Sequence, residues 1–278
     1  MANVEFSASE LKKIIRKTNA CFVWGGSLGL APADDKIIQV EKLLNLDPEA
    51  QLLASIMSKK LAVGADYIII DIPYGKTAKV SKKKAEKLKR KFSQIAKYFK
   101  VKLKCLLTDG SQPIGNGIGP NLEMRGILLV LKNKGPQDLR EKALFLTGEL
   151  LELCKKAKKG EGYKLAEQVL SSGKAFKQFK KIIKAQGGKI TKLPLGKHSY
   201  TFTSKKSGIV KEIDNKKLAY LARLAGCPSD NASGIYLNVH LNNKIKKKDN
   251  LLTIYSESKA KLKQAVNFYK KEKIINIH

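Results

Sequence analysis

The fold class is decided by residues 52–80, which read LLASIMSKKLAVGADYIIIDIPYGKTAKV. The first half has apolar residues at helical spacing, and Gly64 stands where such a helix would end. The apolar run YIIIDI, residues 67–72, then has the length of a strand and ends in an aspartate and an isoleucine. A helix that leads directly into a strand without polar alternation indicates a buried sheet that is covered by helices.

Further signals on either side extend this pattern. A lysine-rich amphipathic helix is expected over residues 81–99, and a second strand over residues 101–107. Upstream, residues 20–24 are short and apolar and precede Gly25 and Gly26, which suits a buried strand that enters a tight loop. Strands and helices that alternate with short connections predict an α/β fold, with a mixed or parallel sheet flanked by helices.

Two helix starts carry capping signals. Ser7 followed by Glu10 forms a capping box, which predicts that a helix begins there. The run Asp47, Pro48 and Glu49 offers an N-cap aspartate, a proline at the first helical position and an acid near the positive helix end. We therefore expect the helix of the opening stretch to begin at this run.

The predicted secondary structure changes after residue 185, from a helical pattern to short strands with two helices. Residues 137–185 have a helical pattern with a glycine-containing break at residues 160–162. Beyond them, short strands are expected at residues 200–203, 208–213, 235–240 and 251–255, with helices at residues 216–225 and 259–269. We therefore expect two domains: an α/β domain over residues 1–185, and a small α+β C-terminal domain over residues 186–278.

The net charge keeps nucleic-acid binding open as a hypothesis of a different class. The chain has 278 residues with 55 Lys plus Arg and 24 Asp plus Glu, which gives a formal charge of +31, and 43% of its residues are hydrophobic. Only five of the basic residues are arginines, and the lysines fall mainly on amphipathic helices, which is typical of a solvated surface. The basic patches still allow weak, nonspecific adsorption to nucleic acid, which a salt titration would expose as purely electrostatic.

The sequence gives little support for a membrane span or a metal site. No apolar run has the length of a membrane span, so we expect a soluble, cytoplasmic protein without membrane contact. The four cysteines lie far apart without a metal-ligand spacing, and there are three histidines. We expect buried reduced thiols and no metal site.

Three loops follow the predicted strands, at residues 25–36, 73–80 and 109–121. Ligands of α/β sheets gather at the carboxyl ends of the strands, so these loops are candidates for binding. The third loop, DGSQPIGNGIGPN, is rich in glycine, which lets the backbone approach a ligand closely.

Three ordered segments resemble the thymidine and pyrimidine-nucleoside phosphorylase family. They are LAPADDK at residues 30–36, the opening stretch at residues 52–80, and LLTDGSQPIGNGIGPNLEMRG at residues 106–126. The likeness is strongest to the archaeal-type branch that includes AMP phosphorylase, and the tail at residues 207–214 and 249–258 extends it. The resemblance implies a pentosyltransferase that uses phosphate to split a thymidine or other pyrimidine nucleoside into free base and pentose 1-phosphate. The alternative within the class is phosphorolysis of AMP or other nucleoside monophosphates.

The resemblance also implies the base-binding residues. The family's S-x-x-x-K motif matches Ser55 and Lys59, which would contact the ring and the carbonyl oxygen of the base. Residues four apart lie on one helix face, and Leu52 shares that face and could pack on a flat base. The catalytic residues stay unknown at this stage.

Departures from the family pattern limit these expectations. The family's base-site arginine has no counterpart near residues 36–54, which leaves the base preference open. A monovalent cation is implied by the loop at residues 114–117, but the family's glutamate ligand aligns with Gly126, so no cofactor is expected. The phosphate motif K-H-S-T-G-G is absent, and Lys197 and His198 begin only a superficial imitation of it. We expect a C-terminal portion of a longer homodimeric enzyme, inactive by itself, whose phosphate site lies elsewhere.

Overall fold

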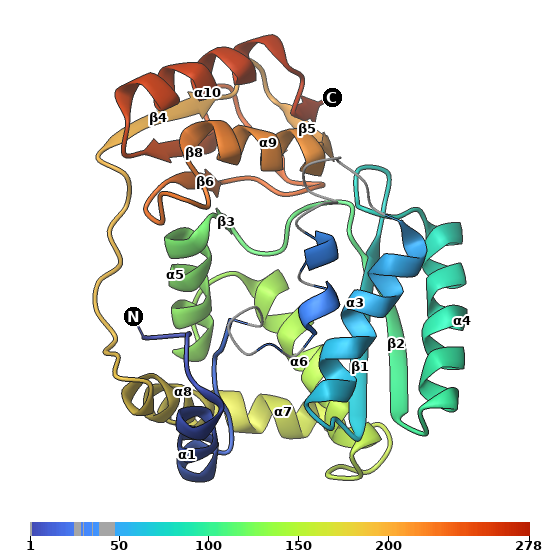
Figure 1. Ribbon diagram of the computed structural model, residues 1–278. Coiled ribbons are helices and arrows are strands. Elements are labelled where there is room, and N and C mark those ends of the chain that lie inside the picture. The colour runs from blue at the N-terminus through green and yellow to red at the C-terminus, as the bar shows by residue number, and fades with distance from the viewer. Residues whose placement is uncertain (1, 25–28, 30, 35, 39–47) are drawn as a thin grey trace. The chain divides into compact units, whose positions relative to one another are not determined.

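The computed structural model describes residues 2–24, 29, 31–34, 36–38 and 48–278 (Figure 1). The chain forms two compact units that interleave along the sequence. The first contains Met1–Asp71, Glu86–Leu106 and Leu146–Thr191, and the second contains Ile72–Ala85, Leu107–Phe145 and Lys192–His278. The final passage from the first unit to the second follows Thr191, close to the domain boundary that the sequence suggests after residue 185. That boundary stays a prediction.

The N-terminal helix of the first unit confirms its capping signal. Helix α1 (Ala8–Thr18) begins after Ser7, whose hydroxyl oxygen accepts a hydrogen bond from the Glu10 amide, while the Glu10 carboxylate accepts one from the Ser7 amide. Both otherwise unsatisfied amides are thereby paired. Helix α1 packs against helix α8 (Lys174–Ala185), as Figure 1 shows at the blue end of the chain.

The predicted strand at residues 20–24 is wrong, because these residues form no strand. Their backbone pairs with the side chain of Gln186, which is only 2% exposed: its Oε1 accepts the Phe22 amide at 2.7 Å, and its Nε2 donates to the Phe22 and Asn3 carbonyls. Phe22 and Trp24 are 42% and 59% exposed, so the apolar run is not buried on both faces. A side chain from far along the sequence replaces the neighbouring strand.

Replacing Gln186 with alanine should lower the free energy of unfolding by about 3 kcal/mol, because three part-buried backbone groups would lose their partner at about 1–3 kcal/mol for each unsatisfied group, offset in part by water. Urea denaturation checks this value. The exposed Gln137, whose Nε2 donates to Glu141 Oε1, is the matched control, and Gln137→Ala should change stability by less than about 0.5 kcal/mol. Equal effects of the two substitutions would contradict the role of Gln186.

A strand–helix–strand unit follows, as the sequence predicts. Strand β1 (Tyr67–Tyr74) and strand β2 (Lys102–Asp109) form a two-stranded sheet, and helix α4 (Lys82–Tyr98) connects them. Helix α4 buries one stripe, made of Ala85, Leu88, Phe92 and Ala96, at helical spacing. Most of its lysines are exposed, which confirms that this charge run is a solvated helix face. The α/β class is confirmed, with sheets smaller than those the sequence pattern suggested.

A run of helices follows the strand–helix–strand unit in the sequence. Helices α6 (Gln137–Leu153), α7 (Gly162–Ser171) and α8 confirm the predicted helical region and its break at residues 160–162. Helix α5 (Pro120–Leu131) begins inside the predicted loop at residues 109–121 and was not predicted. None of the helices in the described ranges is long and apolar enough to cross a membrane.

The second unit contains the C-terminal α+β region. One antiparallel sheet has the order β3 (Gly117–Ile118), β6 (Gly234–Leu237), β8 (Asn250–Ser256) and β4 (His198–Thr203). A second has the order β7 (Lys244–Ile245), β5 (Gly208–Ile213) and β9 (Ile275–Ile277). Helices α9 (Asn215–Ala225) and α10 (Lys259–Lys271) pack on each other, and a continuous core joins them to the strands. The α+β class that the sequence predicts for this region is thereby confirmed, and its extent as a separate domain stays a prediction.

All four cysteines are free thiols, as predicted, although only Cys105 is buried and the other three are half-buried. Burial raises the pKa of the Cys105 thiol to about 11. Because the thiolate is the reactive form, Cys105 is chemically inert near neutral pH.

Candidate functional site

Helix α3 (Glu49–Ala62) carries the two polar residues that the sequence singles out. Leu53 and Met57 are buried and anchor the helix, whereas Ser55 and Lys59 are half-buried and lie about one turn apart on another face. The pair is thus neither enclosed in the core nor turned fully outward. That intermediate position suits side chains that both pack and contact a ligand.

The start of α3 differs by one residue from the sequence expectation. Pro48 is the N-cap and Glu49 the first helical residue, while the predicted cap Asp47 lies outside the described residues. Glu49 forms ion pairs with Lys87 and Lys91 of α4, and these contacts lower the pKa of its carboxyl group. At the other end Gly64, with φ +69°, follows the C-cap and ends the helix as predicted. The helix that carries Ser55 and Lys59 is therefore held at both ends.

A single carboxylate brings Ser55 and Lys59 together. Asp34 belongs to the helical residues 32–34 of the LAPADDK segment and is only 7% exposed. Its Oδ2 accepts a hydrogen bond from Ser55 Oγ at 2.9 Å and forms an ion pair with Lys59 Nζ at 2.9 Å. Its Oδ1 accepts from Gln51 Nε2 at 2.8 Å. Three side chains of α3 therefore converge on Asp34.

Asp34 and Gln51 are site residues that sequence reasoning missed. The signal was present, because buried aspartates are nearly always paired and LAPADDK is one of the segments that carry the family resemblance. What the sequence does not give is which side chains satisfy this carboxylate. Leu52 is half-buried on the same helix, and its role against a flat base stays a prediction.

The electrostatics around this cluster favour an anionic or electron-rich ligand. The pKa of Lys60 is lowered, mainly because the ammonium is partly buried and also because the charge of Lys59 is adjacent. Lys59 pairs with the Asp34 carboxylate, and the charge of Lys60 lies next to it along the helix. Residues 39–41, where the family's arginine would be sought, lie outside the described part of the chain.

Two of the predicted loops lie together within the second unit. A Cβ on Gly75 would approach the Ser111 amide nitrogen to 3.0 Å, and the Gly110 amide donates to the Tyr74 carbonyl at 2.8 Å. The Gly110 carbonyl accepts from Asn215 Nδ2 at 2.8 Å. Glycine is therefore favoured here because the loops at residues 73–80 and 109–121 pack backbone against backbone.

The loop at residues 114–117, which the family resemblance associates with a cation, makes contacts of its own. The Gly115 amide donates to the Asp138 carboxylate at 2.9 Å, and Gly126 faces Leu139. Within the described ranges, no three His, Cys, Asp or Glu side chains gather in a way that could hold a metal. The expectation that no monovalent cation binds at the backbone carbonyls of this loop stays untested. Farther along, Lys197 pairs with Glu257 while His198 begins strand β4 and pairs with Ser256 in register.

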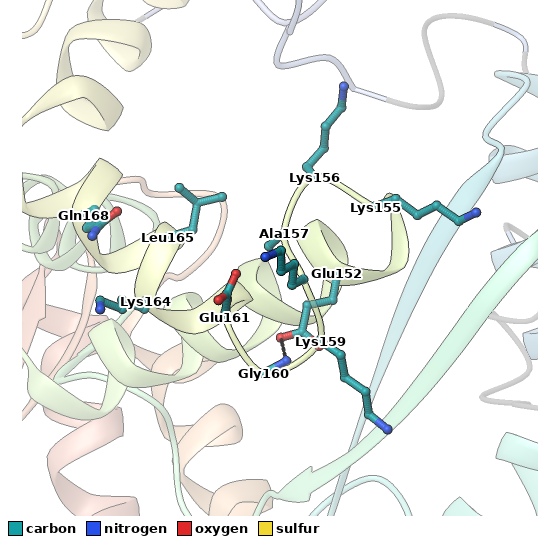
Figure 2. A pocket seen from close by; sticks show the side chains of 11 residues that line it. Glu152, Lys155, Lys156, Ala157, Lys159, Gly160, Glu161, Lys164, Leu165 and Gln168 are labelled. Atoms are coloured by element: carbon teal, nitrogen blue, oxygen red, sulfur yellow. Dashed lines mark hydrogen bonds between the residues drawn. The ribbon is translucent and has the colours of Figure 1, made fainter.

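A hollow of about 860 Å³ lies between the end of α6 and α7, and Figure 2 shows its lining. One Glu152 oxygen accepts the amides of Gly162 and Gly160 at 3.0 Å, and these two bonds lower the pKa of its carboxyl group. Five lysines surround the hollow, Lys155, Lys156, Lys158, Lys159 and Lys164. The labelled side chains of Lys155, Lys156 and Lys159 point away from one another, so they do not converge on one small anion.

Comparison with known proteins gives the class of this chain. Residues 209–276 match the pyrimidine nucleoside phosphorylase C-terminal domain. AMP phosphorylase of Methanococcus aeolicus is 45% identical over 274 residues, which are 96% of this chain and 54% of that relative. The chain belongs to the pyrimidine nucleoside phosphorylase family and corresponds to its C-terminal part.

Two further relatives agree. AMP phosphorylase of Thermococcus kodakarensis is 45% identical over 282 residues, covering 99% of this chain and 56% of that protein. A Legionella pneumophila (strain Paris) protein with the provisional name thymidine phosphorylase is 43% identical over 280 residues, covering 100% and 54%. The chain spans about half the length of the curated relatives it matches.

Proposed function

We propose that this chain is the base-binding part of a nucleoside phosphorylase, a pentosyltransferase that releases a free base and a pentose 1-phosphate. The observation that carries the proposal is the placement of Ser55 Oγ and Lys59 Nζ, each 2.9 Å from the same Asp34 oxygen. These are the two residues that the family resemblance assigns to the base. The proposed substrates of the full-length protein are phosphate and a nucleoside or nucleotide.

The chemistry of phosphorolysis explains why such a pair is useful. Breaking the glycosidic bond leaves positive charge on the sugar and negative charge on the departing base. A fixed ammonium beside the base lowers the energy of the transition state more than that of the bound substrate. Lys59 supplies this charge, and Ser55 fixes the ring. The phosphate is held by segments outside this chain, so the chain by itself is proposed to be inactive.

Two substrate classes compete within the proposal. Thymidine or another pyrimidine nucleoside is the first, and a nucleoside monophosphate such as AMP is the alternative, supported by the names of two relatives.

We also propose that the full-length protein is a homodimer. The diverging lysines around the hollow are consistent with weak, salt-sensitive adsorption to nucleic acid and not with a reading surface.

The test is a phosphate-dependent assay of the full-length parent with thymidine, uridine, AMP, CMP and UMP at one phosphate concentration. Release of free base only when phosphate is present supports the proposal, and the preferred compound decides between the two classes. Omission of phosphate is the control for simple hydrolysis. A parent that converts none of these compounds would rule the proposal out.

A further inference from the structure

The carboxylate of Asp34 determines which hydrogen bonds Ser55 can make. A carboxylate has no hydrogen to donate, so in the 2.9 Å contact between Ser55 Oγ and Asp34 Oδ2 the serine must be the donor. A serine hydroxyl has a single hydrogen. Once that hydrogen points to Asp34, Ser55 can offer any other partner only its lone pairs. Ser55 is thus set as an acceptor.

Lys59 has the opposite character. Its ammonium group can only donate, and one of its donors is directed to the same Asp34 oxygen at 2.9 Å. This contact fixes the head of an otherwise flexible side chain within one turn of Ser55. The helix therefore presents one acceptor and one cationic donor side by side, and both are oriented by a carboxylate that is itself 7% exposed.

Gln51 fixes the carboxylate. Its Nε2 donates to Asp34 Oδ1 at 2.8 Å, so that oxygen is engaged and Oδ2 is the one that meets Ser55 and Lys59. These three donors come from the same helix, spaced by four residues from Gln51 to Ser55 and from Ser55 to Lys59. The rotation of the Asp34 side chain is thereby restricted from the side of α3.

We propose that Asp34 is a positioning residue that makes Ser55 a hydrogen-bond acceptor and Lys59 its neighbouring donor. The pair then reads a base edge on which an N–H group lies beside an acceptor atom. The ring N–H and adjacent carbonyl of uracil or thymine have this pattern, and so do the amino group and adjacent ring nitrogen of adenine. An edge with two adjacent acceptors does not. This inference rests on the proposed function for the identity of the ligand.

The first experiment needs no ligand. In the 278-residue chain, ¹H–¹⁵N spectra of lysine side chains should show a restrained Lys59 ammonium signal that broadens or disappears in Asp34→Ala. Lys60 serves as the internal reference, because its signal should stay. A Lys59 signal that is unchanged by Asp34→Ala overturns the positioning role.

The second experiment measures base recognition in the full-length parent, with uridine and N3-methyluridine or their monophosphates. The wild type should prefer the unmethylated compound by at least about 10²-fold in kcat/KM, because methylation removes the N–H that Ser55 accepts. Asp34→Ala frees the serine hydrogen, and this preference should fall at least about tenfold. Unchanged preference in Asp34→Ala overturns the inference.

A conservative variant separates orientation from general loss of structure. Asp34→Asn keeps a side-chain oxygen that can accept from Ser55 and Lys59, because the Gln51 amide can turn so that its oxygen accepts from the amide N–H introduced at position 34. Asp34→Asn should therefore keep most of the substrate preference that Asp34→Ala loses, and a folded Asp34→Asn variant that loses this preference as fully as Asp34→Ala overturns the inference. Absence of base release from the wild type with an intact Lys59 signal would overturn the proposed function and leave the positioning of Lys59 supported.

Discussion

Replacing Lys59 with alanine in the full-length parent should lower kcat/KM by about 10²-fold, the usual effect of removing a donor that stabilises developing charge. The physical reason is the charge that the base acquires as the glycosidic bond breaks. Because this charge is largest in the transition state, most of the loss should appear in kcat and less of it in KM. Initial rates over a range of nucleoside concentrations at saturating phosphate measure both constants.

Lys60 is the matched control for this substitution. Lys60→Ala removes the same charge from the same helix as Lys59→Ala, but the Lys60 side chain leaves the helix about 100° away from that of Lys59. Lys60→Ala should therefore have a much smaller effect on kcat. If the two variants lose activity equally, the loss reflects the general positive potential of this region, and the specific role of Lys59 is wrong.

Replacing Gly234 with alanine should lower the free energy of unfolding by about 4 kcal/mol. Gly234 has φ +153°, and an added Cβ would collide with the Ile118 carbonyl oxygen and lie 3.2 Å from Gly119 Cα. These are backbone atoms that cannot rotate away. The overpacking costs about 1–3 kcal/mol, and the unfavourable φ adds about 1–2 kcal/mol. Chemical denaturation of the chain measures the change.

Gly173 is the control for the backbone contribution alone. Its φ of +73° is also unfavourable for alanine, but nothing lies within 4 Å of an added Cβ. Gly173→Ala should cost about 1 kcal/mol. The difference between the two variants then isolates the close approach of strands β3 and β6. Similar costs at both positions would show that this approach is not tight in solution.

The local signals in the sequence were sufficient for most of the elements. The periodic apolar residues of α4, the capping box of α1 and the apolar run of β1 each depend on residues within one or two turns or within one strand. These elements appear at nearly the predicted residues. Strands β3 and β7, by contrast, have two residues each, which is too short for any periodicity.

The remaining features depend on contacts between distant parts of the chain. Residues 20–24 have a strand-like composition, yet the amide and carbonyl of Phe22 are hydrogen-bonded by Gln186, which lies 164 residues away. In the candidate site, Ser55 and Lys59 were predictable from a motif on one helix. Their shared partner Asp34 lies 21 residues before Ser55 and joins them only through the tertiary fold. The number of residues between Asp34 and Ser55 does not reveal that their side chains lie within hydrogen-bond distance.

The interleaving of the two units constrains how the protein can be divided for expression. Four elements contain residues of both units: strands β1 and β2 and helices α4 and α6. A single cut in the chain therefore cannot separate the two units. A fragment that starts at residue 186 would lack β3, which pairs with β6 at Gly117–Tyr236 and Ile118–Ile235. It would present β6 as an open edge, and such edges promote aggregation. Genetic dissection of this molecule therefore calls for point substitutions or joined segments in place of simple truncation.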